Sequence, residues 1–249
     1  MDWKKEYANK IVSVEEAVSH VQSGNRIVFT HACGEAQALT AELVRQADPL
    51  ENVEIVHMVA LGKAPYCQPG MEKHFRHNAL FVGGSTRKAV EEGRGDYTPC
   101  FFHEIPKLFT DGTLPVDVAF LQLSEPDENG VCSYGVSVDY TQPAAEAAKL
   151  VIAQINKNMP YTYGNGINLK DIDYIVEKDE PLIESQPPKI RETEHKIGEY
   201  VASLIHDGDT LQLGIGAIPD AVLSFLGDKK DLGIHSEMFS DGVVDLARK

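Results

Sequence analysis

The sequence predicts an α/β fold made of two similar domains, each with a largely parallel sheet. Three observations support this fold class. Helix and strand patterns alternate along the chain, one helix–strand–helix stretch recurs at a shift of 184 residues from Gly24 to Gly208, and a glycine turn joins a strand to a helix at residues 214–219. Alternating patterns are typical of parallel sheets, in which helical crossovers connect the strands. We therefore expect ligands to bind at the carboxyl ends of the strands.

The composition excludes several classes of protein. The net charge of −15 argues against nucleic acid and anionic membrane surfaces as partners. No run approaches the ~18 apolar residues of a membrane span, and the first residues lack the apolar stretch of a signal peptide. The four cysteines are widely spaced, which indicates reduced thiols rather than a disulfide framework or a zinc site. We expect a cytoplasmic protein without a metal centre.

The first elements follow from local patterns. Ser13 to Glu16 is a capping box, and it predicts a helix that runs to a stop at Gly24. The remaining patterns of the first 155 residues are strands at 26–30, 53–59, 79–82, 116–123 and 150–155, and helices at 35–46, 86–92 and 143–149.

The internal repeat suggests how the chain divides. With Gly24 placed over Gly208, a helix, a Gly-Asn or Gly-Asp turn, a strand, a small-residue loop and a second helix recur in the same order. We expect an N-terminal domain at 1–185 and the start of a second at 186–249, joined by the proline-rich stretch 181–188. The alternative is that any two helix–strand–helix units look alike.

The second copy is much shorter than the first. It provides two or three strands and two helices, too few to close a sheet or bury both of its faces. We therefore expect the second domain to be incomplete in this chain. On this expectation the remainder has been cleaved off, lies on a separate chain, or was left out of this sequence.

A glycine loop lies between a strand pattern at 210–213 and a helix pattern at 220–225. Its residues Gly214 to Pro219 include two glycines that let the backbone approach a ligand, at a helix N-terminus that favours negative charge. The third glycine of a dinucleotide fingerprint is missing. The alternative is a tight turn without a ligand.

Glu237 ends the next strand pattern, at 232–237. Small and apolar neighbours would partly desolvate its carboxylate, raise its pKa and make it a better nucleophile or base. Together with the N–H groups of the glycine loop, such a carboxylate suits acyl transfer, in which oriented donors hold the oxyanion. The alternative is a solvated glutamate that caps a strand.

Two further segments are candidates for a pocket. His31 ends the first strand pattern and can hydrogen-bond a substrate carboxylate or carbonyl, although a lone histidine is often structural. The segment from Gly130 to Asp139 is small and flexible, which suits a pocket wall or lid, or else a hairpin. Cys132 has no evident partner for thiol catalysis.

Six stretches of the chain match one known family. They are Met1–Lys5, Leu61–Lys63, Phe102–Pro106, Gly135–Thr141, Leu211–Val222 and Gly233–Asp245. In these stretches the chain resembles the acetyl-CoA hydrolase/transferase family, and within it the 4-hydroxybutyrate and butyryl-CoA:acetate CoA-transferases.

The resemblance implies a fold and a mechanism. Family members have two similar α/β domains with the active site between them. The glutamate that matches Glu237 attacks the acyl-CoA thioester and then carries coenzyme A as a glutamyl thioester, with ping-pong kinetics. The loop matching Gly214, Ile215, Gly216, Ala217 and Ile218 contacts coenzyme A and stabilises the oxyanion, while His31 and Gln212 match the substrate pocket. Coenzyme A is then a substrate, with no permanently bound cofactor, and the protein is a homo-oligomer.

Two other functions stay open at this point. An acyl-CoA hydrolase would use the same glutamate with water as the acceptor. A catalytically silent binding or assembly fragment would result if the later glycine-rich segments of the family, absent here, are never supplied.

Overall fold

A computed structural model describes residues 2–248. The chain forms two compact units, Met1–Glu184 and Ser185–Lys249, which we call unit 1 and unit 2.

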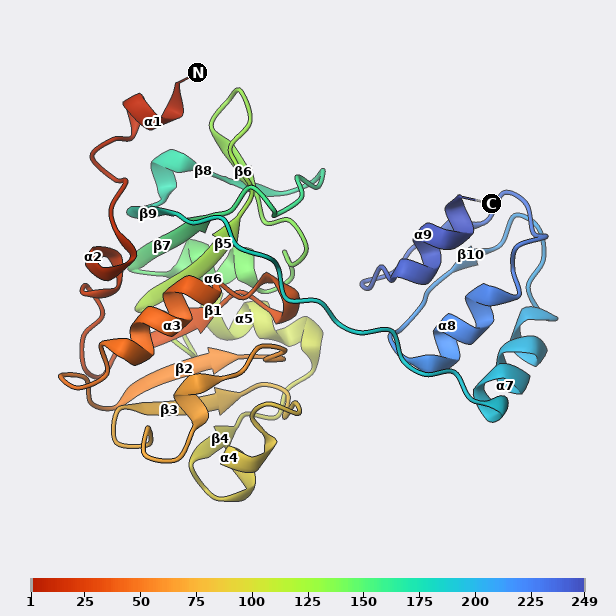
Figure 1. Ribbon diagram of the computed structural model, residues 1–249, viewed down its shortest axis with the longest axis horizontal. Coiled ribbons are helices and arrows are strands. Elements are labelled where there is room, and N and C mark those ends of the chain that lie inside the picture. Colours follow the sequence, from red (N-terminus) through yellow and green to blue (C-terminus); the bar gives the residue numbers. More distant parts are fainter. Residues whose placement is uncertain (1, 249) are drawn as a thin grey trace. The chain divides into compact units, whose positions relative to one another are not determined.

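Unit 1 is built on a seven-stranded sheet whose strands are all parallel (Figure 1). Its order is β4-β3-β2-β1-β5-β7-β9. The strands are β1 (Arg26–Phe29), β2 (Val53–His57), β3 (Phe75–Ala79), β4 (Gly95–Tyr97), β5 (Val118–Leu123), β7 (Leu150–Ile155) and β9 (Tyr174–Glu177).

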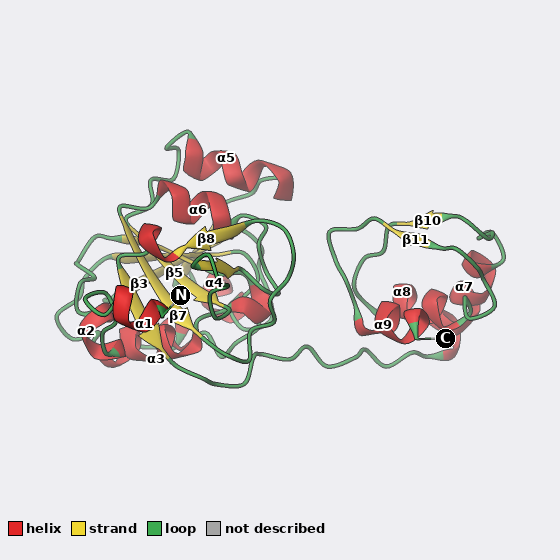
Figure 2. Ribbon diagram, turned by 90° about the horizontal axis from the view of Figure 1, so that it is seen from above, coloured by secondary structure: helices red, strands yellow, loops and turns green. Residues whose placement is uncertain are grey.

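Helices cover both faces of this sheet (Figure 2). On one face lie α2 (Val14–Val18) and α3 (Gln37–Arg45), and on the other lie α5 (Ile105–Thr110) and α6 (Thr141–Ala147). Because both faces are covered, the central strands are apolar on both sides, as the fully buried β5 illustrates.

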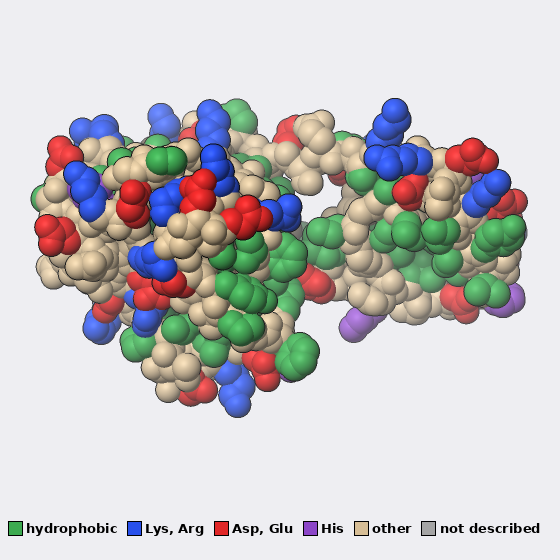
Figure 3. Space-filling view, turned by 90° about the horizontal axis from the view of Figure 1, so that it is seen from below, with side chains coloured by type: hydrophobic (Ala, Val, Ile, Leu, Met, Phe, Trp, Pro, Cys, Tyr) green, Lys and Arg blue, Asp and Glu red, His purple; other side chains and the backbone are tan. Residues whose placement is uncertain are grey.

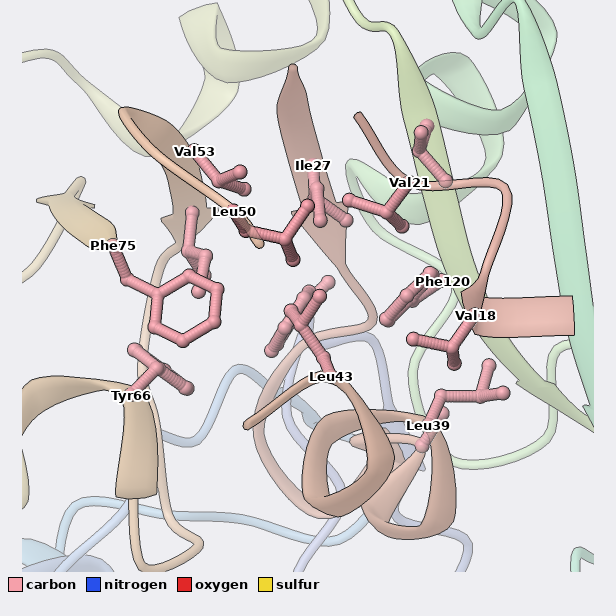
Figure 4. Close-up of a cluster of buried hydrophobic side chains, with 14 of the residues drawn as sticks. Val18, Val21, Ile27, Leu39, Leu43, Leu50, Val53, Tyr66, Phe75 and Phe120 are labelled. Carbon is pink, nitrogen blue, oxygen red and sulfur yellow. The ribbon is translucent and has the colours of Figure 1, made fainter. Parts of the chain in front are cut away.

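The core between α3 and the sheet is close-packed (Figure 4). Leu39 and Leu43 of α3 are fully buried and belong to the same cluster as Ile27 of β1 and Phe120 of β5. The Phe120 ring stacks on that of Phe29, with 5.4 Å between centroids. This packing holds β1 in place and thereby positions the residues that follow its carboxyl end.

The strand order reverses between β1 and β5. The chain runs outward from β1 through β2 and β3 to β4, and then returns to place β5 on the other side of β1. In open parallel sheets, ligands bind at such a switch point, beyond the carboxyl ends of the strands. The loops that follow β1 and β5 therefore border the expected crevice of unit 1.

Smaller elements complete unit 1. They are the helices α1 (Trp3–Glu6) and α4 (Arg87–Glu91), the antiparallel pair β6 (Val131–Ser133) and β8 (Gly166–Asn168), and the 3₁₀ turns η1 (Ala32–Gly34), η2 (Pro65–Cys67), η3 (Phe102–Glu104) and η4 (Leu169–Asp171).

Unit 2 has three helices and one pair of short parallel strands among its described residues. They are α7 (Glu192–Ala202), β10 (Thr210–Leu211), α8 (Ala217–Ser224), β11 (Gly233–Ile234) and α9 (Asp241–Ala247). A small cluster that includes Ala202, Val222, Leu226 and Val243 packs the helices together.

The predicted α/β class with a largely parallel sheet is confirmed. The Ser13 cap forms as predicted, since its hydroxyl accepts the Glu16 amide at 3.1 Å, but the helix ends at Val18 rather than near Gly24. The strand expected at 79–82 is wrong, because the strand is Phe75–Ala79. Its polar residues His77 and Asn78 are buried and hydrogen-bonded, which the hydrophobic pattern cannot reveal.

Residues 2–248 include no helix that is both long enough and apolar enough to span a bilayer. On the face shown in Figure 3, hydrophobic side chains are exposed in both units, between acidic and basic groups.

Candidate functional site

The two strands of unit 2 deliver the glycine loop and Glu237 to neighbouring positions. In the register of β10 and β11, Thr210 lies beside Gly233 and Leu211 beside Ile234. The pairing continues past the strands, because the His235 amide donates to the Leu211 carbonyl at 3.0 Å. The segments that follow β10 and β11 therefore run side by side past the carboxyl ends of the two strands.

Ser236 links these two segments by hydrogen bonds beyond the ends of the strands. Its hydroxyl donates to the Leu213 carbonyl at 2.7 Å. The Leu213 amide in turn donates to the Ser236 hydroxyl oxygen at 3.2 Å. Gly214 and Glu237 each follow one member of this bonded pair. The structure thus brings the first residue of the predicted loop and the predicted nucleophile to one place.

The Glu237 side chain is exposed in this chain. Its small and apolar neighbours in the sequence therefore do not desolvate the Glu237 carboxylate, in contrast to the expectation. The reason is the short two-stranded pair, in which Gly233 and Ile234 are themselves only half-buried. Burial of this carboxylate has to come from groups other than the residues beside it in the sequence.

The glycine loop ends in a backbone conformation that side chains rarely adopt. Gly216 has φ 122° and ψ 179° and caps the N-terminus of α8. The helix starts at Ala217, earlier than the predicted 220–225, so Pro219 lies in its first turn as expected. Ile215 and Ile218 are 70% and 44% exposed, which leaves this helix start open to a ligand.

Gln212 lies between two residues that face the core. Leu211 and Leu213 pack on the apolar cluster of unit 2, whereas Gln212 is exposed. This alternation follows from the two-residue period of a strand. Gln212 thus precedes the glycine loop on the opposite side from the core.

In unit 1, His31 lies two residues past the end of β1, at the switch point of the sheet. It is 8% exposed, and its Nδ1 lies 2.6 Å from Asp139 Oδ2. The rings of Tyr140 and Phe102 lie 5.4 and 5.8 Å from the imidazole, between centroids. The second nitrogen, Nε2, is buried without a hydrogen-bond partner.

The loop after β1 packs closely on the segment that carries Asp139. A Cβ atom on Gly34 would lie 2.8 Å from Thr30 Cγ2 and 3.0 Å from Ser137 Cβ, so only glycine fits without a shift. The sequence predicted His31 and a pocket wall ending at Asp139 as separate candidates. The structure brings them together as a hydrogen-bonded pair.

Comparison with known proteins identifies the family. The profile of the acetyl-CoA hydrolase/transferase N-terminal domain matches residues 1–184. The chain belongs to this family. The resemblance inferred from the sequence is thus confirmed, and so is the CoA-transferase type of fold.

Relatives of this acetyl-CoA hydrolase/transferase chain include named CoA-transferases. It is 61% identical to the 4-hydroxybutyrate coenzyme A transferase of Clostridium kluyveri over 100% of this chain and 58% of that protein. It is 33% identical to the butyryl-CoA:acetate CoA-transferase of Anaerostipes caccae, over 100% of this chain and 57% of that protein. The crystal structure of 4-hydroxybutyrate CoA-transferase from Porphyromonas gingivalis matches with TM-score 0.85 and 42% identity, covering 99% of this chain and 59% of that one.

The chain therefore spans somewhat more than half the length of these relatives.

One buried carboxyl of this family member was missed by the sequence analysis. Glu35 is 2% exposed, and burial raises its pKa, helped by the nearby Glu180 carboxylate and opposed by a bond from Thr40. The amide of Gln122 holds the Glu35 backbone carbonyl at 2.8 Å. Its position after β1 and the turn η1 does not by itself reveal this burial.

The Cys132 thiol is buried. Burial raises the pKa of Cys132 to about 12, so its thiol stays protonated at neutral pH. The described residues contain no group of three His, Cys, Asp or Glu side chains that could hold a metal ion.

Proposed function

We propose that this chain is the larger part of a CoA-transferase that moves coenzyme A from a short-chain acyl-CoA to a small carboxylate. The carrying observation is the bonded pair Leu213–Ser236, which sets Glu237 beside the start of the glycine loop. The names of the relatives support the reaction class. In this proposal residues 1–185 form the N-terminal CoA-transferase domain, and 186–249 begin a second domain.

The reaction proceeds through the Glu237 carboxylate. One carboxylate oxygen attacks the thioester carbonyl, and collapse of the oxyanion expels the CoA thiolate and leaves an acyl-glutamyl anhydride. The thiolate then attacks the glutamyl carbonyl, which releases the first acid and forms a glutamyl-CoA thioester. An acceptor carboxylate reverses these steps, so no water is consumed and no net proton moves.

The loop residues Gly214, Ile215, Gly216, Ala217 and Ile218 supply the oxyanion and CoA contacts in this proposal. Backbone N–H groups at a helix start carry partial positive charge and need no reorganisation to meet an oxyanion. Loss of one such donor typically raises a barrier by ~3–4 kcal/mol. We also assign His31 of unit 1 and Gln212 of unit 2 to substrate binding.

Water has to be excluded, because the anhydride and the thioester both hydrolyse. Since Glu237 is exposed in this chain, the cover has to come from bound coenzyme A, from another part of the protein or from a second copy. We infer a homo-oligomer in the cytoplasm, with coenzyme A as a substrate and no resident cofactor. Light scattering of the purified protein, and mass spectrometry for a co-purifying chain, test the assembly.

The experiment compares Glu237→Gln with Glu199→Gln, which changes an exposed glutamate of α7. Both are made in the purified protein together with any polypeptide that accompanies it. Transfer from butyryl-CoA to acetate should fall by roughly 10³-fold or more in Glu237→Gln, as it does when other enzymes lose their nucleophile. Glu199→Gln should stay at the wild-type rate.

Robust transfer by Glu237→Gln would refute the mechanism. Release of free coenzyme A without an acid acceptor would instead identify a hydrolase that uses the same carboxylate. The absence of either reaction in the wild-type protein would favour a binding or assembly fragment.

A further inference from the structure

The imidazole of His31 is held on one side only. Its Nδ1 is bonded to Asp139, while Nε2 is buried with no hydrogen-bond partner. A buried polar atom without a partner is unfavourable, because nothing replaces the hydrogen bonds that it made with water. This atom lies just past β1, at the switch point where open parallel sheets bind ligands. The unpartnered nitrogen thus marks a position where a ligand group would recover the lost hydrogen bond.

Asp139 is itself fixed by donors on both oxygens. Its Oδ1 accepts the Tyr140 amide at 2.6 Å and the Thr141 hydroxyl at 3.4 Å, and its Oδ2 accepts the Ser137 hydroxyl at 3.3 Å. A carboxylate that receives these donors acts as an acceptor toward His31 as well. The proton of the neutral imidazole therefore lies on Nδ1, and Nε2 presents a lone pair.

We propose that Asp139 is a positioning residue that fixes the tautomer of His31, so that Nε2 accepts a hydrogen bond from a hydroxyl of the acyl substrate. This inference rests on the proposed function, because it assigns His31 to the substrate pocket. It goes beyond that function by naming how the group is oriented and which substrate chemistry it selects.

An acceptor nitrogen distinguishes hydroxyacyl from unsubstituted acyl groups. A hydroxyl satisfies Nε2, whereas an alkyl chain at the same place leaves it unpaired, and sites built around such a bond discriminate strongly. A ligand that reaches Nε2 has to move a neighbouring side chain. The half-buried Phe102, which meets the imidazole edge-on, is one of the side chains beside it.

Asp139→Asn separates orientation from simple loss of packing. The Tyr140 amide and the Thr141 hydroxyl both need an oxygen, so the amide carbonyl of Asn stays on their side. The amide NH₂ then faces Nδ1, which has to become an acceptor, and the imidazole proton moves to Nε2. The matched control Ser137→Ala removes only the longer bond to Oδ2 and keeps the carboxylate.

The first test is ¹⁵N NMR of histidine-labelled 249-residue chain at neutral pH, with the His31 signals assigned by their loss in His31→Gln. Wild type and Ser137→Ala should show the proton on Nδ1, and Asp139→Asn should show it on Nε2. A wild-type proton on Nε2 would overturn the proposal. So would an unchanged tautomer in a folded Asp139→Asn. The wild-type spectrum decides the matter even if that variant does not fold.

The second test measures kcat/KM for a 4-hydroxyalkanoate and for the matching unsubstituted acid in the active protein. Asp139→Asn should lower the preference for the hydroxy acid by roughly 10-fold or more, mainly through KM, while Ser137→Ala keeps it. An equal loss for both acids would overturn the inference but leave the proposed function intact. Absence of transfer to either acid by wild type would instead refute the proposed function, while the NMR result still reports on the pair.

Discussion

The β1–β2 region of unit 1 and the β10–β11 region of unit 2 share one backbone arrangement. In each, a glycine amide after the first helix donates to a distant carbonyl at 2.9 Å, from Gly24 to Glu51 and from Gly208 to Lys230. A parallel pair of strands follows in both. The two regions differ in what the strand ends carry, so the chemistry depends on residues and not on the shared backbone.

The residues that follow the strands differ between the two regions in chemistry and in burial. After the first strand, unit 1 has the buried His31, whereas unit 2 has a glycine loop with an exposed Ile215. Glu54 pairs with Arg26 in unit 1, and Gly233 pairs with the equivalent Thr210 in unit 2. Four residues further along each second strand, Met58 of unit 1 corresponds to Glu237 of unit 2. The buried imidazole thus follows the first strand of the unit 1 pair, whereas the exposed carboxylate follows the second strand of the unit 2 pair.

Burial differs most between the two regions, and substitutions at matched positions measure the difference. Ile27 of β1 is fully buried, whereas its counterpart Leu211 of β10 is half-buried. Ile27→Ala should lower the free energy of unfolding of unit 1 by ~2–5 kcal/mol, and Leu211→Ala should lower that of unit 2 by roughly 1.

Denaturation followed by Trp3 fluorescence reports on unit 1, since this is the one tryptophan of the sequence. Hydrogen exchange of residues 210–213 reports on unit 2. Equal losses at the two positions would contradict the account of the strand pairs.

Acid should weaken unit 1 through histidines buried in its strands. Burial lowers the pKa of His77 to about 4, and burial also lowers that of His57 well below its ordinary value. Between pH 6.5 and about 4, His77 is protonated in the unfolded chain but neutral in the folded state. The free energy of unfolding therefore decreases as the pH falls through this range. At about 1.4 kcal/mol per pH unit, His77 alone accounts for roughly 3 kcal/mol.

The substitution His77→Asn keeps a donor for the Ile55 carbonyl but does not titrate. The free energy of unfolding of unit 1 should then depend less steeply on pH over this window. His103→Asn, at an exposed site, should leave the slope unchanged. A wild-type slope in His77→Asn would show that this imidazole is not the source.

The glycine loop should depend on one of its two glycines. A Cβ atom on Gly214 or Gly216 meets nothing within 4 Å, but only Gly216 has a positive φ, at 122°. A side chain at Gly216 therefore acts through backbone strain and not through crowding of neighbouring atoms. Gly216→Ala should cost ~1–3 kcal/mol of local strain and reduce the use of acyl-CoA. Gly214→Ala is the control, and a larger effect there would remove Gly216 from its role.

The sequence predicted those elements whose burial matches their hydrophobic pattern. The strand at Leu150–Ile155 was predicted to the residue, because it is an apolar run covered on both faces. The strand at Phe75–Ala79 was placed too late, because His77 and Asn78 are polar residues with buried partners. The strand at Tyr174–Glu177 was missed, since four residues at the edge of a sheet carry little pattern.

The site was predictable to the same degree. Glu237 and the glycine loop stand at the ends of strand patterns, and their proximity follows from parallel pairing. The bond between His31 and Asp139 was not predictable, because it joins residues far apart in the sequence. The buried Glu35 could not be distinguished from a surface glutamate without knowledge of what covers it.

The central claim is that the Glu237 carboxylate becomes a thioester of coenzyme A. Incubating the active protein with butyryl-CoA, reducing with borohydride and mapping the peptides by mass tests it most directly. We predict that the peptide containing Glu237 carries the reduced side chain, and that the peptide containing Glu199 is unchanged. An unmodified Glu237 peptide from protein that transfers coenzyme A under the same conditions would contradict the account.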